Sequence, residues 1–297
     1  MTRAAAQRLA YLLIFVTPAL WGVNYLVARS AVDVTAPHAL ALGRWVLAGL
    51  LLTAFSWHEL KAKRAAIRAE WRSLIVLGAL GMWICGAFVY IGAHTTAASN
   101  IALIYAVSPV LIALYSTLAL GERMGPAQAV GVALAFVGVL HVALKGHWPG
   151  LLTLSFTRGD IWIAVAAFAW TAYALILKGV PSSFGPLARL ALTCWGGVVV
   201  LLPFTLIEAV WYLPTLLDAR TLLYVVAVAL FPGFGAYLAF SFMQRELGAA
   251  RVGVVIYLGP LYSAALAWAV LGEPVHPYHL VGAVLILPGI FLATRAR

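Results

Sequence analysis

The chain has 297 residues, of which 64% are hydrophobic and only 9% are charged. This composition excludes a soluble domain, because a water-exposed surface needs far more charged side chains. A net charge of +10 would suit nucleic acid, but the few Lys and Arg residues fall between apolar stretches. We therefore expect no nucleic-acid partner and interpret the positive charge as a sign of membrane topology.

Ten apolar stretches are long enough to cross a bilayer, which takes about 20 residues per helix. In chain order they are approximately residues 10–31, 37–57, 72–92, 97–119, 125–144, 159–178, 186–208, 220–242, 250–271 and 277–295. The first stretch follows two arginines, as in a signal peptide, but it lacks a clear small-residue cleavage site. We therefore predict an all-α integral membrane protein whose first helix is retained.

The distribution of positive charge predicts the orientation of these helices. With the N-terminus in the cytoplasm, fourteen Lys and Arg residues lie on the cytoplasmic side and four on the other. The segment HELKAKRAAIRAEWR (58–72) dominates this bias. Because cytoplasmic loops carry the excess of positive charge, we predict that both termini are cytoplasmic.

The chain also contains an internal repeat. Six residues recur 151 positions later: Pro109, Gly121, Glu122, Pro126, Gly131 and Gly138 reappear as Pro260, Gly272, Glu273, Pro277, Gly282 and Gly289. Trp21 and Pro37 recur 149 positions later as Trp170 and Pro186. We predict two five-helix repeats, residues 1–146 and 155–297. Since five is odd, the second repeat is inverted relative to the first, an arrangement typical of transporters.

Four segments carry a resemblance to a known family. They are ALWGVNYLVAR (19–29), GRWVLAG (43–49), IYAVSPVLIALYSTLALGERMGPAQAVGVALAFVGV (104–139) and IYLGPLYSAALAWAVLGEPVHPYHLVGAVLILPGI (256–290). Together with the ten helices, they make the chain resemble the two-repeat, EamA-type branch of the drug/metabolite transporter superfamily, which includes exporters of amino acids and metabolites. The resemblance implies a central cavity lined mainly by helices 1, 3, 4, 6, 8 and 9, with helices 5 and 10 outside it.

The charged residues bear on the substrate. All nine Asp and Glu residues fall at span ends or in loops, whereas an exporter of cationic drugs usually needs a buried acid. Neutral or zwitterionic substrates are therefore favoured. Arg44 lies well inside a span and could bind a substrate carboxylate with two hydrogen bonds. The favoured alternative is a structural arginine that caps helix carbonyls or extends towards the membrane surface.

Aromatic and amide side chains cluster in the helices expected around the cavity, where they could grip apolar groups and donate hydrogen bonds. The alternative for each is packing between helices or at the membrane interface. With Arg44, they form the predicted substrate-binding set: Trp21, Asn24, Tyr25, Arg44, Tyr90, Tyr105, Trp170, Tyr173, Tyr237 and Tyr257.

Proline and glycine residues suggest where the helices bend or pack closely. Pro109, Pro260, Gly233 and Gly235 are predicted hinges or gates, although such kinks can equally be static. Gly131, Gly138, Gly282 and Gly289 give helices 5 and 10 small faces, which we expect to pack within each half rather than between subunits.

The sequence as a whole predicts an exporter of amino acids, neutral, aromatic or otherwise small and zwitterionic, in a bacterial-type inner membrane. It would work by alternating access as a monomer or weak homodimer. A permease for a nucleoside, sugar derivative or organic acid is the alternative. No constellation of catalytic residues or metal ligands is visible, so we expect neither an enzyme nor a metal or other cofactor.

Overall fold

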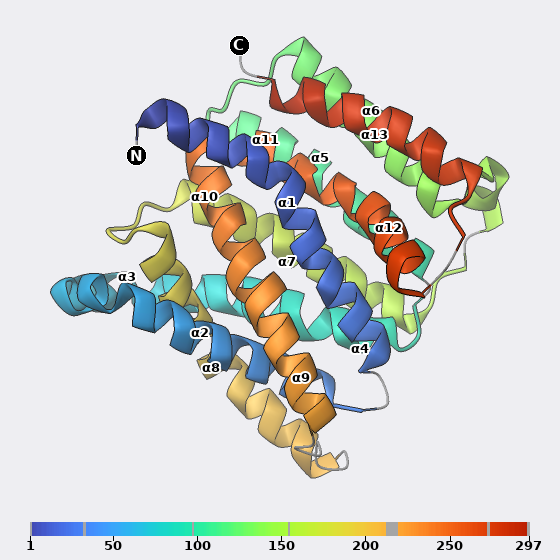
Figure 1. Cartoon of the computed structure of the whole chain (residues 1–297). Coiled ribbons are helices and arrows are strands. Elements are labelled where there is room, and N and C mark those ends of the chain that lie inside the picture. Colours follow the sequence, from blue (N-terminus) through green and yellow to red (C-terminus); the bar gives the residue numbers. More distant parts are fainter. Residues whose placement is uncertain are drawn as a thin grey trace.

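The computed structural model describes residues 2–31, 34–96, 98–153, 155–211, 219–271 and 274–295, and all the regular structure in these ranges is helical. Figure 1 shows the elements, which are α1 (Arg3–Ser30), α2 (Pro37–Ala62), α3 (Arg64–Gly78), η1 (Ala79–Phe88), α4 (Val89–Ala93), α5 (Ala98–Ala119), α6 (Pro126–Ala143), η2 (Trp148–Thr153), α7 (Arg158–Gly179), α8 (Pro186–Trp211), α9 (Ala219–Val228), η3 (Ala229–Ala236), α10 (Tyr237–Leu247), α11 (Ala249–Gly253), η4 (Val254–Leu258), α12 (Gly259–Leu271) and α13 (Pro277–Thr294).

The described residues contain nine helical segments that are long and apolar enough to span a membrane. They match nine of the ten predicted spans. The remaining span, predicted at residues 250–271, corresponds to α11, η4 and α12, in which the apolar helix Ala249–Ala265 is shorter. The sequence explains where three helices begin. Helices α2, α6 and α13 each start with a proline, whose fixed φ suits the first turn of a helix.

The third helix of each half contains a π-helical stretch. Residues 64–93 run as α3, η1 and α4, and residues 219–247 run as α9, η3 and α10. The predicted hinge residues Gly233 and Gly235 lie within η3. Pro260 directly follows the 3-10 stretch η4 and the first residue of α12, whereas Pro109 lies inside the continuous helix α5. Helix geometry is therefore interrupted before Pro260 and not before Pro109.

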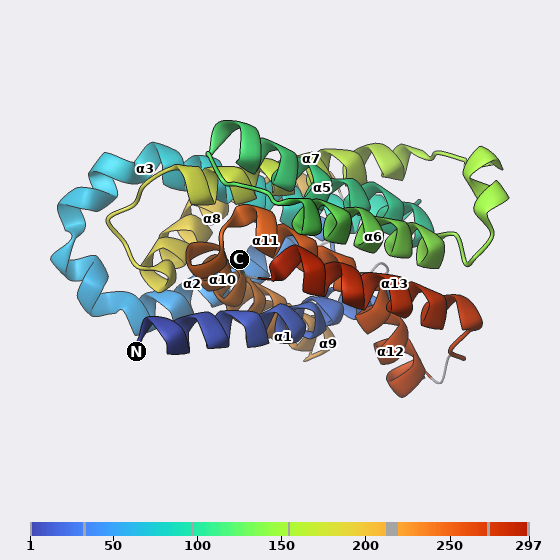
Figure 2. The ribbon, with the colours of Figure 1, turned by 90° about the horizontal axis from the view of Figure 1, so that it is seen from above.

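The outer pair α6 and α13 lies side by side in both views (Figures 1 and 2) and runs antiparallel. A Cβ added at Gly131 would lie 2.4 Å from the backbone nitrogen of Ala293, and one added at Gly282 would lie 2.1 Å from a methyl group of Val142. These glycines therefore allow close contact between the halves. The expected packing of these glycines within each half is wrong, because each glycine face meets the equivalent helix of the other half.

The inner pair α2 and α8 also runs antiparallel. Gly185 lies next to Glu59 at one end, the Trp195 indole donates to Thr53 Oγ1 (2.9 Å) near the middle, and His38 bonds to Glu208 at the other end. Both chain ends lie at the same end of the molecule, where the Tyr11 hydroxyl donates to the Thr294 carbonyl (3.1 Å).

Candidate functional site

A cavity of about 80 Å³ lies between the two halves. Its described lining residues are Pro18, Trp21, Asn24, Arg44, Cys85, Val89, Tyr105, Trp170, Tyr237, Val255, Ile256 and Gly259. They come from α1, α2, the η1–α4 segment, α5, α7, α10, η4 and α12, and none comes from α6 or α13. Six of the predicted substrate-binding residues are brought together here: Trp21, Asn24, Arg44, Tyr105, Trp170 and Tyr237.

A polar cluster from the first half lies at this cavity. Arg44 Nη1 donates to Asn24 Oδ1 (3.0 Å) and is 3.4 Å from the Tyr90 hydroxyl. The Tyr90 hydroxyl donates to the same Asn24 oxygen at 2.6 Å. Three helices are joined in this way, and the guanidinium is held by side chains rather than by helix carbonyls. Tyr90 thus supports the cavity through Asn24 and Arg44.

Arg44 is the one charged side chain among the described residues that line the cavity, and its residue is 3% exposed. Its guanidinium carbon lies 4.3 Å from the centre of the Trp45 ring and 5.7 Å from that of Tyr237, which is cation–π geometry. No described carboxylate lies within 4 Å of it, and its Nε–H has no hydrogen-bond partner. A buried cation with a donor unused is able to bind an anionic group.

Aromatic rings from both halves form a cluster beside the cation. Trp21 meets Trp170 edge-on at 5.4 Å between ring centres, and Trp170 lies 4.8 Å from Phe240 and 5.7 Å from Tyr237. Trp170 also stacks on Tyr173 at 5.6 Å. The two repeat-equivalent tryptophans therefore touch at the interface between the halves. The faces of these aromatic rings form an apolar wall that could bind a substrate.

The π-helical stretch η1 fixes two of these rings through its carbonyl groups. The Trp45 indole donates to the Met82 carbonyl at 2.8 Å, and the Tyr237 hydroxyl donates to the Gly81 carbonyl at 2.8 Å. Gly81 must lack a side chain, since a Cβ would lie 2.7 Å from the Tyr173 ring. Both buried polar groups are thus satisfied, which orients the rings that face Arg44.

The structure places the other predicted residues elsewhere. Tyr173 lines a second cavity, and Tyr257 is fully buried, with its hydroxyl donating to the Ala106 carbonyl at 3.0 Å. The side chain of Tyr25 lies outside the described residues. Among the described residues, no group of three or more His, Cys, Asp or Glu side chains could hold a metal ion.

Two carboxylates that the sequence reasoning did not single out join α2 to α8 reciprocally. Glu59, near the end of α2, accepts the Gly185 N–H at 2.9 Å, just before α8 begins. Glu208, near the end of α8, accepts the N–H groups of His38 (2.9 Å) and Ala39 (3.2 Å) in the first turn of α2. The two glutamates are 149 positions apart, the same offset as the tryptophan pair. Each end of this antiparallel pair therefore has an equivalent carboxylate cap.

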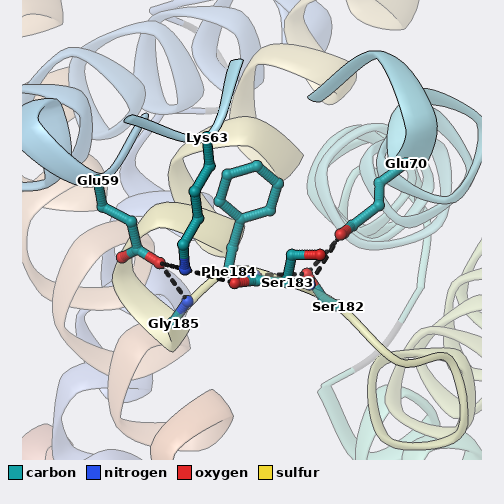
Figure 3. Close-up of polar contacts among 7 residues, drawn as sticks. All are labelled: Glu59, Lys63, Glu70, Ser182, Ser183, Phe184 and Gly185. Carbon is teal, nitrogen blue, oxygen red and sulfur yellow. Dashed lines mark hydrogen bonds and ion pairs between the residues drawn. The ribbon is translucent and has the colours of Figure 1, made fainter. Parts of the chain in front are cut away.

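The loop 180–185 lies at the end of the molecule that holds the chain termini (Figures 1 and 2). Further contacts, drawn in Figure 3, hold this loop. Glu59 also pairs with Lys63 (2.7 Å), whose ammonium donates to the Ser183 carbonyl. Glu70 accepts the Ser182 hydroxyl at 2.6 Å and the Ser183 N–H at 2.7 Å. Two carboxylates of the first half therefore fasten the loop between α7 and α8 of the second half.

A fourth carboxylate, in the loop after α5, joins the halves near the start of α11. Glu122 accepts the N–H groups of Ala249 (2.9 Å) and Ala250 (3.0 Å). Gly248, directly before α11, has a φ of +91° and would place a Cβ 2.9 Å from the Glu122 carboxylate. The first copy of the repeated Gly-Glu pair thus caps a helix of the second half. The second copy, Gly272 and Glu273, lies outside the described residues.

Comparison with known proteins gives full-length matches. The profile of the EamA-like transporter family matches residues 8–144 and 157–295. The chain is 26% identical to the uncharacterized transporter YyaM of Bacillus subtilis, over 92% of this chain and 89% of that protein. It is 26% identical to a probable terminal-alkyne amino-acid exporter of Streptantibioticus cattleyicolor, over 93% and 90%.

Two more distant likenesses also span nearly the whole chain. An S-adenosylmethionine/S-adenosylhomocysteine transporter of Chlamydia muridarum is 23% identical over 91% of this chain and 87% of its own length. One crystal structure superposes with a TM-score of 0.77 at 21% identity, covering 99% of this chain and 97% of that one. That structural likeness shows the fold.

Proposed function

Because the chain belongs to the EamA-like transporter family, we propose that it exports amino acids or similarly small zwitterions across a bacterial-type inner membrane. The chain is a multi-pass membrane transporter and not an enzyme. Its substrate site is the cavity between the halves, where Arg44 receives the carboxylate and the aromatic cluster receives the side chain. The transporter acts as a monomer or weak homodimer.

The observation that carries this proposal is the environment of Arg44. Its guanidinium is buried at the cavity, is held by Asn24 and Tyr90, and has no described carboxylate within 4 Å. A charge inside a membrane protein is costly unless it is paired or functional. A substrate carboxylate would supply the missing partner of the guanidinium.

Two of the relatives are compatible with this substrate class. One is named as a probable exporter of terminal-alkyne amino acids, and another as a transporter of S-adenosylmethionine. Both molecules carry an α-amino carboxylate head, whose carboxylate Arg44 would bind. The cavity of about 80 Å³ is smaller than the roughly 300–1,000 Å³ of pockets for drug-sized ligands, which favours a small substrate in this conformation.

For the mechanism, we propose alternating access by two inverted halves with ten spans and cytoplasmic termini. The antiparallel contacts of α6 with α13 and of α2 with α8 support this inversion. The reciprocal caps at Glu59 and Glu208 lie at opposite ends of the α2–α8 pair, so rocking of the halves could loosen one cap while keeping the other. The interrupted helix before Pro260 and the π-stretch containing Gly233 and Gly235 are the proposed bending points.

The alternative is a permease for another small organic metabolite, and Arg44 would then suit an organic acid. A counterflow screen in proteoliposomes separates the two, with tritiated L-alanine, L-leucine and L-phenylalanine compared with tritiated uridine and succinate. Exchange of at least one amino acid, lost in Arg44→Met, is the expected result. Exchange of succinate or uridine without any amino acid would refute the proposed substrate class.

A further inference from the structure

A second cavity of about 230 Å³ lies at the end of the molecule that holds both termini. Its described lining residues are Tyr173, Leu177, Lys178, Val180, Pro181, Ser182, Phe184, Pro186, Arg189, Leu190, Thr193, Ser241, Gln244 and Arg245. We propose that this cavity is a second binding site for the zwitterionic head of an α-amino acid, loaded from the cytoplasm before the substrate reaches the central cavity. This inference rests on the proposed function.

The charge of the lining suits a carboxylate. Lys178, Arg189 and Arg245 contribute three cations, of which Arg245 pairs with Glu246 outside the lining (3.0 Å), and no Asp or Glu is among the described lining residues. Arg189 uses Nη1 and Nη2 to cap the carbonyls of Leu177 (2.8 Å) and Val180 (2.9 Å), so it contributes mainly a fixed positive field. Lys178 lies in the partly exposed rim and has three donors, of which one bonds to the Gln244 carbonyl at 3.3 Å. Its ammonium can therefore receive an incoming carboxylate.

Gln244 supplies the complementary acceptor. The residue is 1% exposed, and its amide nitrogen donates to the Ala174 carbonyl at 2.8 Å. This bond fixes the orientation of the amide, because the reversed amide would set two oxygens against each other. The remaining oxygen, Oε1, is buried without a hydrogen-bond partner. An unsatisfied buried acceptor is costly, and the ammonium group of an amino acid would satisfy it.

The internal repeat relates this cavity to the central one. Asn24 and Arg44, which line the central cavity, correspond at the 149-residue offset to Tyr173 and Thr193, which line the second cavity. Positions that face the central cavity in one half therefore face a cavity in the other half too. The second half replaces the arginine by a threonine, and Lys178 supplies the positive charge at the rim instead.

Aromatic rings lie between the two cavities. Trp170 lines the central cavity and stacks on Tyr173, which lines the second one, at 5.6 Å between ring centres. Tyr173 also lies 5.7 Å from Tyr237. The outer wall includes Ser182 and Phe184, in the loop that Glu59 and Glu70 fasten (Figure 3). The rings of Trp170 and Tyr173 thus stand between a substrate in the second cavity and the central cavity.

Equilibrium binding to the purified full-length protein tests this proposal, with tritiated L-alanine, L-leucine and L-phenylalanine as probes. Gln244→Met removes the free acceptor at similar volume, and Arg44→Met removes the central cation. Gln128→Met is the matched control, because Gln128 is a similarly buried amide on α6 that lines neither cavity. Thermal unfolding of each variant reports folding, and Lys178→Gln provides a second variant on the exposed rim.

We expect two bound probe molecules per wild-type and Gln128→Met chain. Gln244→Met and Lys178→Gln should each weaken one of these sites by about tenfold, as expected for a hydrogen bond to a charged group, and Arg44→Met should weaken the other. One site, lost in Arg44→Met and unchanged in Gln244→Met and Lys178→Gln, would overturn this inference and leave the proposed function standing. Loss of a site only in Gln244→Met and Lys178→Gln would refute the proposed central site instead.

Two further outcomes of the binding experiment would also refute the second site. Absence of binding of all three probes to the wild type would contradict both proposals. Displacement of the probe by phosphatidylglycerol, with equal affinity in wild type and Gln244→Met, would assign the basic lining to lipid headgroups.

Discussion

Arg44→Met gives the sharpest test of the central cavity, because the structural and functional explanations of this arginine predict opposite results. The substitution removes one bond to Asn24 and a longer contact to Tyr90. The bond from Tyr90 to Asn24, at 2.6 Å, does not involve Arg44 and would remain. Neither partner is therefore left unsatisfied. The methionine would replace a buried cation that has no described carboxylate within 4 Å.

The expected change in stability is accordingly small or favourable. A charged side chain at the centre of a membrane helix costs about 2.5–3.5 kcal/mol on insertion scales, and exchanging buried charge for an apolar side chain is often neutral or stabilising. The expected change in transport is large. A hydrogen bond to a charged group contributes about 1.5–3 kcal/mol, which corresponds to roughly a 10- to 150-fold loss of substrate affinity.

Counterflow kinetics and thermal unfolding of the same purified variant measure the two quantities. Arg44→Lys is the companion variant: it keeps the charge but loses the planar fork, so intermediate transport is expected. A fall in the unfolding midpoint of Arg44→Met, with normal transport by the folded fraction, would refute the functional role and establish the arginine as structural.

Three further predictions follow from individual contacts. Trp170→Ala should reduce transport at least tenfold, since it removes a ring that lines the central cavity and stacks on Tyr173 of the second cavity. Trp162→Ala, on a 39% exposed residue, should not reduce transport, and equal effects of the two variants would contradict the aromatic site. Gly131→Ala should destabilise the protein by about 1–3 kcal/mol through overpacking against α13, as measured by denaturant unfolding. Ala133→Val, on the exposed face of α6, should be neutral, and similar stability of both variants would contradict the close approach. Glu70→Ala should raise hydrogen exchange in the loop 180–185 by about tenfold or more; unchanged exchange there would show that this carboxylate does not fasten the loop.

The position of the central cavity could be predicted from sequence because lipid penalises polar groups. Asn24 and Arg44 are polar residues inside apolar spans, so they need a protein environment and not lipid around them. The internal repeat makes Trp21 equivalent to Trp170. Their rings meet at 5.4 Å. The sequence left two roles open for Arg44, and its surroundings favour the functional role, since both hydrogen bonds go to side chains rather than helix carbonyls.

Other features depended on details that residue patterns do not carry. The hydroxyl of Tyr257, in the 3-10 stretch η4, reaches the Ala106 carbonyl. The residue pattern before Pro260 did not predict this 3-10 stretch, nor the continuous helix around Pro109. The π-stretches that anchor Trp45 and Tyr237 likewise have no residue signature. For Glu59 and Glu208 the sequence does carry a signal, because the two acids are separated by the 149-residue offset of the repeat.

The polar cluster at the cavity belongs to one half only, and this suggests which contacts bind the substrate and which respond to movement of the halves. Arg44, Asn24 and Tyr90 all belong to the first half and bond to one another, so rocking of the halves leaves this cluster intact. Its contribution to substrate affinity is therefore similar in both conformations, and a ligand shifts a conformational equilibrium only through contacts that differ between the states. Those differing contacts are the rings that meet across the halves, Trp21 with Trp170 and Trp45 with Tyr237. On the proposed function, the first half would hold the charged head, while the substrate's side chain, lying among rings of both halves, would select which conformation is stable.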